Sequence, residues 1–238
     1  MPEAVAVLQL DQVIIVNGGF LLAADLEIAP GRKVAVMGPS GAGKSTLVNG
    51  IAGFHEVPEG RVLWQGEDIT DLPPGKRPVA MLFQDGNLFP HLTIRQNAGL
   101  GLRPDLKLND ADWAQVDQAL ARVGLADLGE RRPAELSGGQ QSRAALARVL
   151  VQAKPVLILD EPFSALGPAL KVEMLDLVAE LTAESGATVL MVTHDPEDAA
   201  RLADQIVLVA NGVAHPPEGA QAMLADPPPA LKAYLGEG

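Results

Sequence analysis

The sequence predicts an α/β fold with a parallel sheet and a helical insertion, and three observations lead to this prediction. Short apolar runs alternate with longer helical patterns over most of the chain, which is typical of parallel-sheet folds. A glycine-rich loop at residues 38–43 lies between one such run and a helical pattern. The stretch from about residue 85 to residue 153 is mostly helical. A chain of 238 residues can form one large domain or two small ones.

The N-terminal part of the chain contains strand-like runs followed by a loop and a helix. Strands are expected at Val5–Leu10, Gln12–Val16, Leu22–Ile28 and Lys33–Met37. The glycine-rich loop, Gly38–Gly43, follows the last of them. A helix is then expected at Thr46–Ala52.

In the helical stretch, Val116, Leu120 and Val123 recur at the spacing of a core-facing helix stripe. Strands resume after Pro155, at Val156–Leu159, Val189–Val192 and Ile206–Ala210. Between the first two, one helix face is marked by the apolar residues Leu170, Met174, Leu177, Val178 and Leu181, and this helix is expected to end near Gly186. From Pro227 onward we expect a loosely held end.

Composition excludes several classes of function. The chain carries 18 Lys and Arg against 30 Asp and Glu, a net charge of −12, which argues against broad binding of nucleic acid. It has no cysteine, and therefore no disulfide, thiolate metal site or thiol catalysis. Neither a signal peptide nor a membrane-spanning run is visible, so we expect a cytoplasmic protein that can still sit on a membrane protein.

The glycine-rich loop continues into a phosphate-binding motif. Residues 38–45 read GPSGAGKS, which matches G-x-x-x-x-G-K-[ST]. Glycines let a backbone approach phosphate oxygens closely, and the following helix N-terminus adds partial positive charge. Lys44 would reach the β- and γ-phosphates, and the Ser45 hydroxyl would ligate Mg²⁺. The plainer interpretation is a glycine-rich turn with a solvated lysine, but the strand before it and the helix after it favour phosphate binding.

Two carboxylates follow the apolar strand at 156–159. In a fold with a phosphate loop, the first, Asp160, is placed to hold Mg²⁺, and the second, Glu161, to polarise the attacking water. Adjacent side chains of a strand point to opposite faces, so the two should have separate tasks. The alternative is an ordinary exposed strand end before the turn at Pro162.

A second helix end carries glycines beside a serine cap. Residues 136–140 read LSGGQ, and Ser137 and Gln140 have the spacing of a capping box. The plain interpretation is a capped helix. Exposed glycines at a helix N-terminus can also bind phosphate.

The motifs GPSGAGKST, LSGGQ and LILDEP, followed by a lone His194 after a strand, occur in the order and spacing found in ABC-transporter ATP-binding subunits. The resemblance covers about residues 8–212. It implies a P-loop NTPase fold, with a RecA-like core and an N-terminal antiparallel β subdomain. It also implies a single domain over residues 1–238, with a helical subdomain inserted at residues 85–154.

The resemblance implies roles for the matching residues. Glu161 resembles the general base, and His194 resembles the switch histidine that contacts the γ-phosphate. Together with Lys44 of the phosphate loop, they would form the catalytic set. Mg²⁺ would be held by Ser45, Gln84 and Asp160. ATP would be bound by Gly38, Pro39, Ser40, Gly41, Ala42, Gly43, Lys44, Ser45, Thr46, Gln84, Ser137, Gly139 and Gln140. Because the last three would act on ATP held by the opposite subunit, hydrolysis would require a head-to-tail pair of chains.

Within this family, the segments 78–84, 87–93 and 99–109 are similar to those of ATPases of bacterial thiamine and thiamine-pyrophosphate importers. The resemblance implies partners: a second copy of the chain, membrane permease subunits and, indirectly, a solute-binding protein, but no nucleic acid. The location implied is the cytoplasmic face of the membrane. Alternatives are an importer ATPase for iron, sulfate or polyamine, or a non-transport nucleotide-binding module.

Two positions depart from the family pattern. The family's Ser-Ala-Leu-Asp becomes Ser-Ala-Leu-Gly here, and Gly167 replaces an aspartate that normally contacts the partner subunit. Asn17 occupies the place of the aromatic residue that normally stacks on adenine, with Phe20 as a possible substitute. We therefore expect weaker coupling between the two ATP sites of the dimer and a looser preference for adenine.

Overall fold

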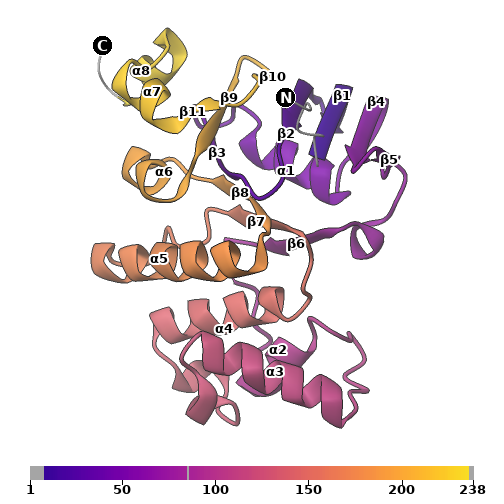
Figure 1. Ribbon diagram of the computed structural model, residues 1–238, viewed down its shortest axis with the longest axis vertical. Coiled ribbons are helices and arrows are strands. Elements are labelled where there is room, and N and C mark those ends of the chain that lie inside the picture. Colours follow the sequence, from indigo (N-terminus) through magenta and orange to yellow (C-terminus); the bar gives the residue numbers. More distant parts are fainter. Residues whose placement is uncertain (1–7, 85, 236–238) are drawn as a thin grey trace.

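A computed structural model describes residues 8–84 and 86–235 (Figure 1). Antiparallel strands form its N-terminal part: β1 (Leu8–Asn17), β2 (Phe20–Ile28), β4 (Glu56–Trp64) and β5 (Glu67–Asp68). β1 replaces the two strands expected there. The pairing with β2 shifts register between Leu10 and Val13, and Gln12 has a φ of 50°, so a bulge bends one strand without ending it. Residues 5–7 of the expected first strand lie outside the described residues.

A parallel sheet forms the centre of the molecule. Its strands are β3 (Lys33–Met37), β6 (Val79–Leu82), β7 (Val156–Asp160), β8 (Thr188–Val192) and β9 (Gln205–Ala210). They lie side by side in the order β9-β3-β8-β7-β6. The predicted parallel α/β sheet is confirmed. β6, β7 and β8 are consecutive strands, whereas β3 lies between β8 and β9, which do not follow it directly along the chain.

Short strands join the two parts. β10 (Val213–Ala214) pairs parallel with β2 and antiparallel with β9, and β11 (Glu218–Gly219) also pairs with β9. Within the described residues this makes one continuous sheet of eleven strands. The N-terminal strands and the phosphate-loop strand are therefore parts of the same rigid framework.

Alternate residues of the central strands pack into different core clusters. On β3, Val34 and Val36 belong to the cluster that contains helix α1 (Lys44–Ala52), whereas Ala35 and Met37 belong to the cluster of α6 (Pro196–Leu202) and α7 (Ala220–Ala225). This period of two is expected where helices cover both faces of a parallel sheet.

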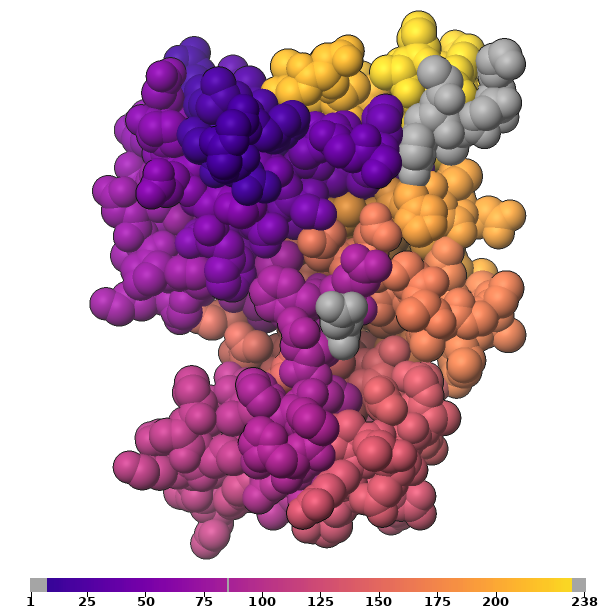
Figure 2. All heavy atoms as spheres, turned by 180° about the vertical axis from the view of Figure 1, so that it is seen from behind, coloured from indigo at the N-terminus to yellow at the C-terminus, as the bar shows by residue number. Residues whose placement is uncertain are grey.

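Three helices occupy the chain between β6 and β7: α2 (Ile94–Gly99), α3 (Asp110–Arg122) and α4 (Gly138–Leu150). Short 3₁₀ turns lie at Pro74–Lys76, Ala126–Leu128 and Pro133–Glu135. Val116, Leu120 and Val123 are buried, as their spacing predicts. Figure 1 shows the three helices together at the bottom of the molecule, and Figure 2 shows the surface narrowing above them. The subdomain boundaries at 85 and 154 remain a prediction.

Helix α5 (Pro168–Ser185) ends at Gly186, as expected, but its predicted core face is partly wrong. Met174, Val178 and Leu181 are buried, whereas Leu170 is 42% exposed. Leu170 lies in the first turn of the helix, where it contacts Gly139 of α4 instead of the core. The expectation of a loose tail is also wrong for the described part, because α8 (Pro229–Leu235) forms and Leu231 is fully buried.

Candidate functional site

The phosphate loop runs from the end of β3 to the start of α1, as predicted. Gly38 has a φ of 148°, and a Cβ there would lie 2.0 Å from the carbonyl oxygen of Val209. Gly41 and Gly43 also have positive φ, at 75° and 108°. Only glycine adopts these conformations at this spacing without strain. Pro39 O accepts a hydrogen bond from Ala42 N at 3.1 Å, and the exposed Ser40 and Gly41 form the tip of the loop.

Lys44 opens helix α1 and folds back across its own loop. Its Nζ donates to Gly38 O at 2.8 Å and to Pro39 O at 3.0 Å. Burial lowers the pKa of Lys44, while the charges of Glu161 and Asp160 act in the opposite direction. The ammonium is therefore already inside the loop and faces the two carboxylates at the end of β7.

Asp160 and Ser45 meet although 115 residues separate them. Ser45 Oγ donates to Asp160 Oδ1 at 3.2 Å. Burial raises the pKa of Asp160, the Ser45 hydrogen bond lowers it, and neighbouring Glu161 raises it further. The pair offers a hydroxyl and a carboxylate oxygen side by side, which is the kind of donor set that Mg²⁺ takes together with substrate phosphates.

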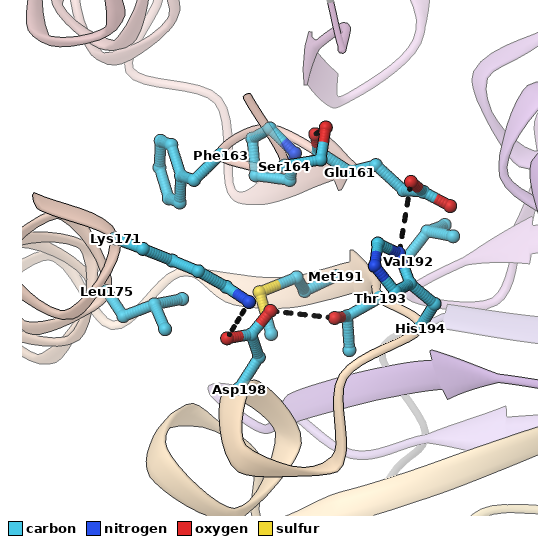
Figure 3. Close-up of a pocket in the computed structure, with 11 residues that line it drawn as sticks. Glu161, Phe163, Ser164, Lys171, Leu175, Met191, Val192, Thr193, His194 and Asp198 are labelled. Atoms are coloured by element: carbon cyan, nitrogen blue, oxygen red, sulfur yellow. Dashed lines mark hydrogen bonds and ion pairs between the residues drawn. The ribbon is translucent and has the colours of Figure 1, made fainter. Parts of the chain in front are cut away.

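Glu161 lies just past β7 with a φ of 44°, and its side chain points toward His194, which follows the end of β8. His194 Nδ1 lies 3.3 Å from Glu161 Oε2 (Figure 3). The two neighbouring carboxylates thus have different partners, Ser45 for one and His194 for the other. The different partners come from the left-handed backbone of Glu161, which lies beyond the strand, and not from strand alternation. The separate tasks of the two carboxylates remain a prediction.

The residues of the LSGGQ run form the N-terminus of α4. Ser137 Oγ accepts from Gln140 N at 3.4 Å, and Gln140 Oε1 accepts from Ser137 N at 2.9 Å, so the predicted capping box is confirmed. Gly139 is buried, and a Cβ there would lie 3.3 Å from Leu170. Figure 1 shows α4 in the lower half of the molecule and α1 in the upper half. Ser137, Gly139 and Gln140 are therefore not brought beside Lys44 of the same chain.

Gln84 follows β6 and is exposed. It lines a groove together with Gly138 at the start of α4 and Pro162 after β7. The next described residues, Gly86 and Asn87, both have left-handed backbones, with φ of 61° and 47°. Arg148 of α4 donates to both of their carbonyl oxygens, at 2.7 and 2.6 Å. Sequence analysis missed this clamp, because an arginine in a helix gives no sign of carbonyl acceptors 61 residues away.

Asn17 and Phe20 both lie against the phosphate loop. Asn17 Nδ2 donates to Oγ1 of buried Thr46 at 3.5 Å. The ring of Phe20 packs under Gly43, where a Cβ would approach the ring edge to 2.8 Å. Phe20 therefore packs against the backbone of the phosphate loop at Gly43. Its role in stacking on adenine stays a prediction.

Comparison with known proteins agrees with this geometry. A family model described as ABC transporter matches residues 21–164. The chain is 62% identical over 229 residues to the thiamine import ATP-binding protein ThiQ of Ruegeria sp. (strain TM1040), covering 96% of this chain and 99% of the relative.

Two solved structures are similar to this chain. An ATP-binding cassette of an ABC transporter in its ADP conformation has a TM-score of 0.87 at 24% identity, covering 97% of this chain and 99% of that chain. A dimeric cassette in a post-hydrolysis state, bound to ADP and Pi, has a TM-score of 0.76 at 29% identity, covering 90% and 98%. The expected P-loop NTPase fold is confirmed by these similarities.

Proposed function

The chain belongs to the ABC transporter family and is an ATPase, and from this premise we propose that it powers the import of thiamine or its phosphates through a membrane permease. The 62% identity to a thiamine import ATP-binding protein over nearly the full length of both chains supports this solute. The hydrolytic function rests on one observation: five polar side chains lie close together near the ends of β3, β7 and β8. They are Lys44, Ser45, Asp160, Glu161 and His194.

The phosphates of ATP would be held by the loop from Gly38 to Gly43 and by Lys44, Ser45 and Thr46. When phosphate oxygens enter, the Lys44 ammonium would exchange its two carbonyl acceptors, Gly38 O and Pro39 O, for them. The N-terminus of α1 adds favourable charge at the same point.

Mg²⁺ would be held by Ser45 and Asp160, whose oxygens already lie 3.2 Å apart, with Gln84 as a further oxygen ligand. Bound there, it would neutralise charge on the β- and γ-phosphates. The raised pKa of Asp160 is consistent with such a site, because a nearby cation stabilises the carboxylate that burial disfavours.

Glu161 would orient and polarise the attacking water, and His194 would contact the γ-phosphate. The 3.3 Å separation of His194 Nδ1 and Glu161 Oε2 lets the histidine hold the carboxylate in place, as catalysis by positioning requires.

Two chains would together complete each site. Ser137, Gly139 and Gln140 lie at the N-terminus of α4, in the other half of the molecule from α1, so a second copy facing head to tail would supply them to each nucleotide. The dimeric ADP-bound and Pi-bound cassette among the similar structures supports this arrangement. Gly167 would then face the partner without the aspartate usual at this place.

The permease would hold the chain at the cytoplasmic face of the membrane, and a solute-binding protein would deliver the solute to that permease. Over residues 8–84 and 86–235, no helix has both the length and the apolar character to cross a bilayer. Gln84 lies in an open groove and would sense the permease while also reaching the metal.

A phosphate-release assay tests the hydrolytic assignment. The purified full chain should hydrolyse ATP, and E161Q should bind ATP while releasing phosphate at least about 100-fold more slowly. An E161Q protein that hydrolyses normally would refute the role of Glu161. Co-purification with the neighbouring membrane subunits tests the solute: recovery of a permease with a binding protein for another nutrient would refute thiamine.

A further inference from the structure

A charged cluster that contains Lys171 and Asp198 lies beside Thr193, the residue before His194 (Figure 3). Lys171 of α5 places its Nζ 2.5 Å from Asp195 Oδ2 and 2.8 Å from Asp198 Oδ1. The Lys171 side chain is only 19% exposed and Asp198 is buried. Sequence analysis did not select Lys171 or Asp198, because their meeting depends on the packing of α5 against α6.

The cluster reaches both backbone neighbours of His194. Asp198 Oδ2 accepts from Thr193 Oγ1 at 2.8 Å, and Thr193 Oγ1 in turn accepts from Asp195 N at 3.1 Å. Thr193 N also donates to Val36 O at 3.3 Å, which ties the segment to the strand before the phosphate loop. His194 therefore lies between two residues, Thr193 and Asp195, that belong to one network of ion pairs and hydrogen bonds.

Lys171 is the only cation in direct contact with these two carboxylates among the ion pairs of the described residues. Burial alone would lower the pKa of Lys171, but the hydrogen bonds to Asp195 and Asp198 raise it overall. Without the ammonium, two carboxylates would face each other in a partly buried space, and one of them would have to turn toward water. Whether Asp195 or Asp198 turned, the backbone next to His194 would move with it.

The cluster also joins His194 to the loop that faces the expected partner chain. Lys171 lies in the first turn of α5, and its N–H donates to Gly167 O at 3.0 Å. The loop from Glu161 to Gly167 thus leads into the helix turn that carries the ammonium. A shift of this loop would reach the histidine through one side chain.

We propose that Lys171 is a positioning residue that fixes the His194 loop, and so His194 itself, opposite Glu161. The proposal rests on the proposed role of His194 in hydrolysis. Lys171 touches neither nucleotide nor water in this scheme and acts through Asp195, Asp198 and Thr193. Through Lys171, the first turn of α5 fixes the position of His194.

A second ion pair between the same two helices provides a matched control. Arg201 of α6 binds Asp176 of α5, with Nε 2.7 Å from Oδ1, and both side chains are exposed. This pair joins α5 to α6 as Lys171 does, but it does not contact Thr193 or Asp195. A residue that only fastens the two helices together would behave like Arg201.

The test compares K171M, K171R and R201M in the full chain by steady-state ATP hydrolysis, with wild type and H194A as references. K171M should lower kcat at least about 10-fold with KM for ATP changed less than about 2-fold, because the misplaced group acts after binding. K171R should recover kcat to within about 3-fold of wild type, and R201M should leave kcat unchanged. Should K171M fail to fold, the isosteric D198N carries the same expectation with a smaller loss.

A kcat of K171M within 2-fold of wild type, or an equal loss in R201M, would overturn the proposal. Failure of the proposed function gives a different result: the wild-type chain would then release no phosphate that depends on Glu161 and His194. If wild type is active and H194A is not, while K171M matches wild type, only the positioning role is wrong.

Discussion

Replacing Arg77 with methionine should destabilise the protein by about 3 kcal/mol. The Arg77 side chain is almost fully buried, and its guanidinium donates to four backbone carbonyls. Nη1 binds Gly50 O and Ile51 O at 2.9 and 2.8 Å, at the C-terminal end of α1. Nε and Nη2 bind the carbonyls of Leu72 and Thr70 at 2.8 and 2.5 Å.

The magnitude follows from these contacts. Methionine fills a similar volume but donates nothing, so four carbonyls lose their partner at about 1 kcal/mol each. The loss is partly offset because a buried positive charge is removed, and burial already lowers the pKa of Arg77. About 3 kcal/mol remains, equivalent to about 6–12 °C in melting temperature for a chain of this size. R77K keeps a charge but not the four-way geometry and should lie between the two.

Urea unfolding monitored by circular dichroism measures this loss, with the midpoint and slope fitted together. K76M provides the control, because Lys76 is the exposed neighbour and its substitution should change stability by less than about 0.5 kcal/mol. A loss below 1 kcal/mol in R77M would refute the reasoning that these four carbonyls depend on the guanidinium.

Three further predictions concern the site. At Gly167 an added Cβ meets nothing within 4 Å and φ is −65°, so G167D should change the free energy of unfolding by only a few tenths of a kcal/mol. The variant should strengthen ATP-driven dimerisation, measured by gel filtration, and ATP hydrolysis, measured by phosphate release. If G167D changes neither, the cross-subunit contact is contradicted. F20A should weaken ATP binding several-fold by calorimetry, and an equal effect on GTP would show support of the loop, whereas an effect on ATP alone would show adenine stacking. Burial raises the folded-state pKa of Asp160 above its unfolded value, so its carboxylate costs stability above that pKa and the cost disappears as pH falls through it. D160N should therefore raise the melting temperature at pH 7 while abolishing hydrolysis, and a lower melting temperature for D160N would contradict this sign.

Much of the site could be predicted because its chemistry is local in sequence. The loop at 38–45 needs its glycines at fixed offsets, and the structure gives Gly38, Gly41 and Gly43 positive φ. The capping box at Ser137 is likewise set within a few residues. Local rules of backbone conformation are sufficient for each of these.

Features that depend on distant contacts could not be predicted. β4 has mostly exposed residues and includes Pro58, so it lacks the alternation of a strand and forms because β1 offers it a partner. Leu170 fits a core stripe by spacing, yet it is at the helix start, where it covers Gly139. The carbonyls that Arg77 and Arg148 bind are likewise supplied by other elements, so their identity follows only from the fold.

The strand order of the central sheet has a consequence for synthesis on the ribosome. β3, which carries the phosphate loop, pairs only with β8 and β9 among the described strands, and these begin at Thr188 and Gln205. At about 5–20 residues per second, the ribosome needs roughly 8–30 seconds to make the 150 or so residues between β3 and its first partner. The antiparallel strands β1, β2 and β4 need no such wait, since all end by Trp64. A nascent chain can thus hold an ordered N-terminal hairpin and still lack the partner strands of its phosphate-loop strand, so nucleotide can stabilise the protein only after β8 and β9 have been made.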